Sequence, residues 1–184
     1  MDNEGEIQID VLCEQFPQVE CFVQHYTYYT SLRDAHPSNE DLDFWDEAST
    51  VFLGSAILVW CNVFGSCNSN LHWSKLIKNM PFKVEQDFKD RIYKSTGLGE
   101  EGFKELRNDI KALRDKYFAH RDRNWQEHIW NSPDFDNALK VAMVYGGWLN
   151  DLLEKESSPL MNSLSDIVKS AEEEIKNVIE HLSS

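Results

Sequence analysis

The sequence lacks the residue patterns of most metal and cofactor sites. No two of its four cysteines form a C-x2-C pair, and no two histidines have zinc-finger spacing. We therefore expect reduced thiols and no structural metal. There is also no H-E-x-x-H, no G-x-S-x-G and no Walker loop, which argues against a zinc protease, an α/β-hydrolase and a P-loop nucleotidase. We expect neither a metal nor a cofactor.

Basic residues are scarce outside the middle of the chain. Residues 1–74 contain one base, Arg33, and twelve acids, and residues 124–184 carry a net charge of −7. Only residues 75–123 are net positive, at +4, in a chain whose total is −14 at pH 7. A molecule this acidic repels polyanions, so we expect no DNA partner and no non-specific nucleic-acid binding. The basic third is either a solvated helix pair with salt bridges or a local site for an anionic ligand.

The sequence also has little that would direct it to a membrane. Its first residues are acidic and lack the basic and apolar regions of a signal peptide. The most apolar run, 51–64, contains Gly54, Ser55 and Asn62 and is too short to span a bilayer. We expect a cytoplasmic protein without membrane contact.

Apolar residues recur at helical spacing along most of the chain, and no segment alternates with the period of two that marks a strand. This pattern predicts an all-α bundle of five or six helices. The expected helices are at about 10–36, 40–64, 82–95, 100–121, 133–156 and 162–182, with a short helical piece at 72–80.

Three stretches organise the expected domain. Residues 1–9 are predicted to be disordered, 10–156 to form the helical domain, and 157–184 to form a C-terminal helix packed on or extending from the bundle.

Particular residues add detail to these helices. Pro17 suits a position near a helix start. The helix at 40–64 is apolar on most sides and is therefore expected at the centre of the bundle. Gly146 and Gly147, inside a predicted helix, indicate a close helix crossing or a kink.

The helix at 100–121 brings charged residues to the border of its own packing face. His120 continues its apolar stripe, while Arg107 and Arg114 lie beside that stripe. Each needs a carboxylate, a partner chain or a ligand to offset the cost of desolvation. The stripe itself has gaps of three and four, at Phe103, Leu106, Ile110, Leu113 and Tyr117.

The string from Arg114 to His120, R-D-K-Y-F-A-H, resembles the signature of HEPN domains. In that signature an arginine is followed by a polar residue and then, four to six positions after the arginine, by a histidine. The longer string at 113–122, and the run W-C-N-V-F-G at 60–65 followed by the His-Trp pair at 72–73, are similar to the AbiU2-like branch.

This resemblance covers residues of about 15–155. It implies an up-and-down HEPN-like bundle that forms a homodimer, with the arginine and the histidine of both chains facing one cleft.

The resemblance further implies a metal-independent endoribonuclease, in which the 2′-OH of the RNA attacks the neighbouring phosphate. His120 would act as general acid or base. Arg114 would stabilise the phosphate, and Asp115 would orient one of the two. Additional RNA contacts are expected from Arg107, Lys116 and Arg121.

The same resemblance suggests a toxin or a phage-defence protein under a cognate antitoxin or regulatory protein. The acidic charge of the chain disfavours long RNA substrates and leaves short or structured RNA, docked at the face formed by 75–123. Some members carry His-x-Tyr, whose tyrosine receives a nucleotide modification. Asp122 occupies that position here, so such regulation is not expected.

Two alternatives remain open. The chain could be a catalytically inactive HEPN-like dimerisation or interaction module, in which carboxylates such as Asp115 or Asp122 satisfy Arg114 and His120. Separately, Cys67 and His72 could form a thiol–imidazole pair.

Overall fold

The computed structural model describes residues 6–35, 42–119, 133–158 and 161–182. Over these residues the prediction of an all-α bundle is confirmed, with six α-helices in the described part. They are α1 (Ile9–Ala35), α2 (Leu42–Trp60), α3 (Phe82–Thr96), α4 (Glu100–Leu113), α5 (Phe135–Lys155) and α6 (Leu164–Leu182). Three shorter segments are the π-helical η1 (Cys61–Gly65), the 3₁₀-helical η2 (Trp73–Lys75) and the π-helical η3 (Arg114–Ala119).

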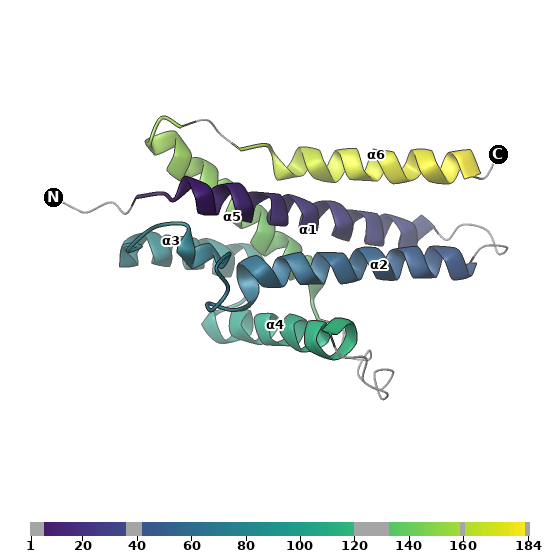
Figure 1. Ribbon diagram of the computed structural model, residues 1–184, viewed down its shortest axis with the longest axis horizontal. Helices are drawn as coiled ribbons and strands as arrows, with labels where there is room; N and C mark the ends of the chain where they lie inside the picture. Colours follow the sequence, from purple (N-terminus) through teal and green to yellow (C-terminus); the bar gives the residue numbers. More distant parts are fainter. Residues whose placement is uncertain (1–5, 36–41, 120–132, 159–160, 183–184) are drawn as a thin grey trace.

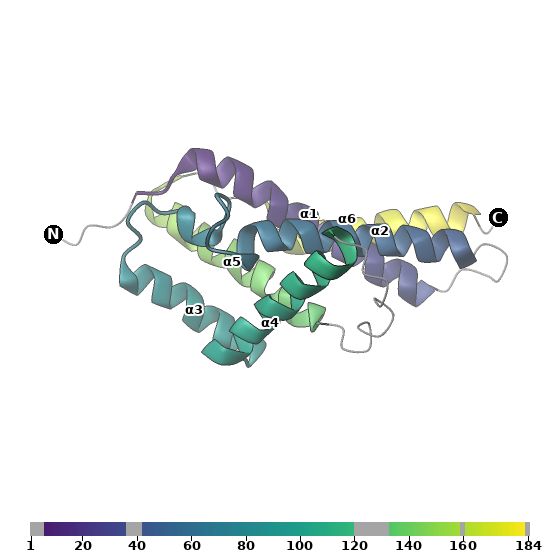
Figure 2. The ribbon, with the colours of Figure 1, turned by 60° about the horizontal axis from the view of Figure 1, so that its bottom comes forward.

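Helix α1 is the centre of the arrangement. Figure 1 shows α1 running between α6 and α2, with α5 crossing behind them, and the contacts of α1 with α2, α5 and α6 agree with this view. Helix α3 packs on α5, and α4 packs against η1 at the end of α2. The turned view in Figure 2 shows α4 crossing obliquely next to α2.

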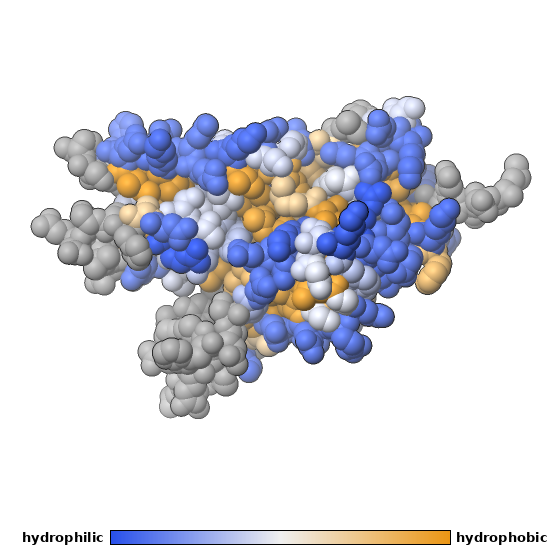
Figure 3. All heavy atoms as spheres, turned by 180° about the vertical axis from the view of Figure 1, so that it is seen from behind, coloured by the Kyte–Doolittle hydropathy of each residue, from blue (hydrophilic) through white to orange (hydrophobic). Residues whose placement is uncertain are grey.

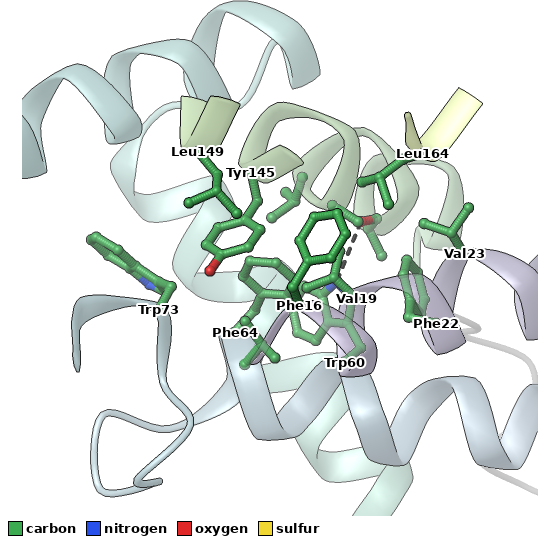
Figure 4. Packing of buried hydrophobic residues seen from close by; sticks show 14 of the residues in the cluster. Phe16, Val19, Phe22, Val23, Trp60, Phe64, Trp73, Tyr145, Leu149 and Leu164 are labelled. Atoms are coloured by element: carbon green, nitrogen blue, oxygen red, sulfur yellow. Dashed lines mark hydrogen bonds between the residues drawn. The ribbon is translucent and has the colours of Figure 1, made fainter. Parts of the chain in front are cut away.

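The core forms where α1, the end of α2 and α5 meet (Figure 4). Apolar residues of α1 recur at Phe16, Val19 and Phe22, and each is at most 1% exposed. They pack with Trp60, whose indole N–H donates to the Ala138 carbonyl at 3.2 Å. Burying a side chain of this size contributes roughly 1.5–3 kcal/mol, so this junction stabilises the packing of α1, α2 and α5.

Two expectations about the N-terminal region differ from the structure. Residues 6–8, inside the stretch expected to be disordered, pair with 76–78 through backbone hydrogen bonds of 2.8 and 3.1 Å, and Ile7 is only 7% exposed. Helix α1 begins at Ile9, so Pro17 lies in its interior rather than near its start.

The glycine pair of α5 marks a close helix approach at only one of its two positions. A Cβ on Gly146 would lie 2.7 Å from Cδ1 of Leu164, the first residue of α6, whereas a Cβ on Gly147 would meet nothing within 4 Å. The predicted close crossing is therefore confirmed at Gly146.

Helix α6 lies on the bundle mainly through α1. A cavity of about 360 Å³ lies between them, lined by Ser31, Ala35 and Ile175 among others. Figure 3 shows the opposite face from Figure 1: polar atoms cover the outside of α6 along the top, and hydrophobic atoms remain visible between α6 and the helices below it.

The sequence predicted that α2 lies at the centre of the bundle. Three of its large apolar side chains are exposed, however, so α2 is not buried on all sides. Among the described helices, the stretch 44–65 is long and apolar enough to cross a membrane, judged by length and composition alone. A core helix of a soluble bundle passes the same test, and 44% of this stretch is buried inside the bundle.

Candidate functional site

Two π-helical segments meet at the place where the sequence analysis put the site. Segment η1 continues α2, segment η3 continues α4, and each segment contacts the helix that carries the other. A π-helix has one extra residue per turn, is rare, and occurs often at functional sites. Here the widened turns place Arg114, the first residue of η3, beside Cys61, the first residue of η1.

Asp115 holds the guanidinium of Arg114. Its Nε and Nη2 lie 2.8 and 2.6 Å from Oδ1 of Asp115, and Cys61 lies beside it. Burial opposes the charge of Arg114, but the hydrogen bond to Asp115 and the charge of that carboxylate outweigh burial and raise the pKa of Arg114. The Asp115 side chain is 54% exposed, so the ion pair contributes at most about 1 kcal/mol. An incoming phosphate could therefore compete for the guanidinium.

Cys61 is buried, with 1% exposure. Burial raises the pKa of its thiol to about 11, although the charges of Arg114 and Lys111 act in the opposite direction. The thiol is therefore protonated at neutral pH, so it can orient Arg114 but does not act as a nucleophile.

Arg107 lies two turns before Arg114 and has a structural partner. Its Nη2 donates to the Gly65 carbonyl at 2.9 Å, which satisfies one of the free carbonyls at the end of the α2–η1 helix. Burial lowers the pKa of Arg107, and its Nε has no hydrogen-bond partner among the described residues. The guanidinium of Arg107 is thus engaged with Gly65. It therefore acts on a ligand near Arg114 mainly by its positive charge rather than by direct contact.

Lys111 completes a row of three cations. Arg107, Lys111 and Arg114 are spaced by four and three residues, which places them on one helical face. A Cβ on Gly65 would lie 3.5 Å from Cγ of Lys111 and 3.3 Å from Cβ of Cys61. The side chain of Lys111 therefore lies against Gly65 at the end of η1.

The sequence analysis did not name Lys111 or Cys61 as site residues. The helical spacing of the basic residues within 100–121 would have identified Lys111 as part of the site. No local signal indicates Cys61, because its contact with Arg114 joins residues far apart in the chain.

Part of the expected site lies outside the described residues, namely His120, Arg121 and Asp122. Of the remaining candidates, the structure brings together Arg107, Arg114 and Asp115 along α4 and η3, and Lys116 is exposed on η3.

His72 lies near Arg107 but does not pair with Cys67. Its Nδ1 is 2.7 Å from the Ser74 hydroxyl and accepts from the Ser74 N–H at 3.3 Å, and its Nε2 has no partner among the described residues. Burial, followed by the charges of Arg107 and Lys75, lowers the pKa of His72 to about 4. The imidazole is therefore neutral, and the thiol–imidazole alternative receives no support from this geometry.

In the described part of the chain, no group of three or more His, Cys, Asp or Glu side chains could hold a metal ion. The chain matches no protein-family model. Comparisons with curated proteins and with solved structures likewise find no significant match.

Proposed function

We propose that the chain is a metal-independent endoribonuclease of the HEPN type that acts on short or structured RNA. The observation that supports this most is the row formed by Arg107, Lys111 and Arg114, set against η1 in an otherwise acidic molecule. Such a row favours a compact anion, and a long polyanion is disfavoured because the rest of the chain is net negative.

In the proposed reaction, His120 removes the proton of an RNA 2′-OH as its oxygen attacks the adjacent phosphorus. The new P–O2′ bond forms, the P–O5′ bond breaks, and the leaving O5′ takes a proton from the imidazolium of His120, which returns to its neutral form. The products are a 2′,3′-cyclic phosphate and a free 5′-OH. Histidine suits this role because it titrates near neutral pH.

Arg114 would bind the phosphate oxygens while negative charge builds up on them. A guanidinium stays protonated and offers paired N–H donors in a fixed plane. Asp115 would position it through their ion pair, and Cys61 lies beside it. Lys116 and Arg121 would contact neighbouring phosphates, and Arg107 would add charge from its place on the Gly65 carbonyl.

Following the same resemblance, we propose a cytoplasmic homodimer that acts as a toxin or in phage defence, with its activity controlled by a cognate antitoxin or another regulatory protein.

The test is RNA cleavage in the presence of EDTA by the wild type, Arg114→Ala and His120→Ala. We expect cyclic phosphate ends from the wild type and a loss of about 100-fold or more in each variant. Arg33→Ala is the matched control, because Arg33 also pairs with the next residue, its Nε lying 2.9 Å from Oδ1 of Asp34 on α1. Full activity in Arg114→Ala would exclude the assignment, as would equal losses in all three variants.

A dimerisation module without catalysis is the second candidate. It is favoured by the contacts of Arg114 with Asp115 and Cys61, which already satisfy much of its guanidinium inside the chain. Absence of cleavage by the wild type on varied RNAs would favour this module.

A further inference from the structure

A thiol, an imidazole and a hydroxyl meet where α1 packs on α2. Cys21 and His25 lie about one turn apart on α1, and Sγ of Cys21 is 3.6 Å from Nδ1 of His25. The same Nδ1 is 2.8 Å from the hydroxyl oxygen of Ser55 on α2, and Ser55 also lies beside the thiol of Cys21. Two helices thus bring three donor atoms together. We call this set the α1–α2 cluster.

The spacing of the sulfur and the nitrogen matches the coordination sphere of zinc. Bonds of about 2.3 Å to sulfur and about 2.0 Å to nitrogen, at the tetrahedral angle, hold these two atoms about 3.5 Å apart. The observed separation of Cys21 Sγ and His25 Nδ1 is 3.6 Å. Without an ion this is the distance of a weak S–H···N hydrogen bond, so the two side chains need little rearrangement to accept one. Ligands at positions i and i+4 of one helix are also how the H-E-x-x-H motif binds zinc.

We propose that the α1–α2 cluster binds Zn²⁺ through the thiolate of Cys21 and the imidazole of His25, with Ser55 and a water molecule as weaker ligands. Thiolate and imidazole are ligands that zinc prefers. No step of the proposed RNA cleavage involves this ion, so the site is an additional one and does not rest on the nuclease.

Aromatic rings from both helices hold the imidazole in place. The ring centroid of His25 lies 5.5 Å from that of Phe52 on α2 and 6.2 Å from that of Tyr28 on α1. The hydroxyl of Tyr28 is fixed in turn, since it accepts from Gln24 at 2.8 Å and donates to Glu174 on α6. Neighbours that orient a ligand in this way raise the affinity of a metal site.

The cluster is also accessible and its histidine is in the required protonation state. Cys21, His25 and Ser55 are all half-buried, so an ion can reach them from solvent. Burial lowers the pKa of His25, so its imidazole is neutral at pH 7 and offers a lone pair. Burial raises the pKa of the Cys21 thiol, so binding Zn²⁺ converts the thiol to a thiolate and releases its proton to water.

The ligand set predicts moderate affinity. Its third donor is a serine, so it is not one of the groups of three or more His, Cys, Asp or Glu side chains excluded above. The hydroxyl of Ser55 has to move from 2.8 Å to about 3.3 Å from Nδ1 of His25 to take a tetrahedral position. Two strong ligands bind zinc less tightly than the four of a structural site. We expect a dissociation constant of about 1 µM.

The first test is a titration of the full chain with Co²⁺, without chelators and with a thiol-free reductant. Co²⁺ occupies zinc sites, and a thiolate ligand gives it a charge-transfer band in the near ultraviolet. We expect this band, with visible bands of tetrahedral Co²⁺, at one equivalent. Cys21→Ser should abolish the charge-transfer band, and His25→Gln should weaken binding at least about 10-fold, since even changes beyond the ligands cost that much.

Cys13→Ser is the matched control, because Cys13 is an exposed thiol on the same helix, and it should leave the band unchanged. Absence of the band in the wild type would overturn the proposal. A band that persists in Cys21→Ser would overturn it as well, because it would mark an adventitious ion only.

The second test uses the wild type alone, so it stands even if the variants fail to fold. At about 10 µM free Zn²⁺, alkylation of Cys21 by iodoacetamide should slow about 10-fold, as ten times the dissociation constant implies. The exposed Cys13 and Cys67 should react at unchanged rates, and mass spectrometry of the peptides separates the three. Equal slowing of all three thiols, or none at Cys21, would refute the site. Neither test measures RNA cleavage, so failure here is separate from failure of the nuclease.

Discussion

Gly146→Ala and Gly147→Ala change neighbouring residues of α5 and should shift stability in opposite directions. At Gly147 the added methyl meets nothing within 4 Å. At Gly146 the same methyl would lie 2.7 Å from Cδ1 and 3.2 Å from Cγ of Leu164. Leu164 is 5% exposed and packed in the core, so its side chain has little room to move away.

The expected sizes follow from two opposing effects. Alanine is favoured over glycine inside a helix by about 1 kcal/mol, so Gly147→Ala should stabilise the protein by roughly that amount. Gly146→Ala gains the same preference but overpacks the contact with Leu164, which costs about 1–3 kcal/mol. The two variants should therefore differ by about 1–3 kcal/mol in the free energy of unfolding.

The assay is urea unfolding followed by far-UV circular dichroism for both single variants, for Leu164→Ala and for Gly146→Ala combined with Leu164→Ala. Leu164→Ala alone leaves a cavity and should cost about 2–5 kcal/mol. In the double variant the new methyl at Gly146 occupies part of that space, so the combined loss should be smaller than the sum of the single losses.

Equal stabilisation by Gly146→Ala and Gly147→Ala would refute this reasoning, because it would mean that α6 does not press on Gly146. Strict additivity in the double variant would refute it as well.

Three further predictions concern residues around the candidate site. Burial lowers the pKa of His72 to about 4, so between about pH 4 and 6.5 the unfolded chain binds more protons than the folded chain. The free energy of unfolding should therefore fall as the pH drops from 6.5 towards 4. In urea titrations at several pH values, His72→Gln should flatten this fall. Cys61, with a buried thiol of pKa about 11, should react with iodoacetamide at pH 8 at least about 100-fold more slowly than the exposed Cys13, as mass spectrometry of timed samples can show. Arg107→Met keeps the aliphatic length but removes the bond to the Gly65 carbonyl, and it should cost about 1.5–3 kcal/mol in thermal unfolding; an unchanged melting temperature would contradict the capping role.

The sequence predicted the helices well because their apolar periodicity is local information. The helix expected at 82–95 is Phe82–Thr96, and the one expected at 133–156 is Phe135–Lys155. The π-helical ends were missed, because an i→i+5 turn has nearly the same residue pattern as an i→i+4 turn. The π-helical segment η1 instead contacts α4, which is distant from it in sequence.

The candidate site was predictable in its residue types but not in their partners. Periodicity placed Arg107 and Arg114 at the border of the packing face, and both are half-buried as that position requires. No local pattern indicated that Arg107 would bond to a carbonyl 42 positions away. The pairing of residues 6–8 with 76–78 was missed for the same reason, since each segment is too short to carry a pattern.

The position of α1 has a consequence for the order in which the protein can fold. Helix α1 is synthesised before α6, and its contacts with α6 wait for a helix that begins more than a hundred residues later. Until α6 has left the ribosome, the apolar surface that it covers on α1 stays open to water. Contacts this distant in sequence slow folding, and exposed apolar surface on a partly made chain invites aggregation. The nascent chain should therefore be more prone to aggregation before α6 packs on α1 than after.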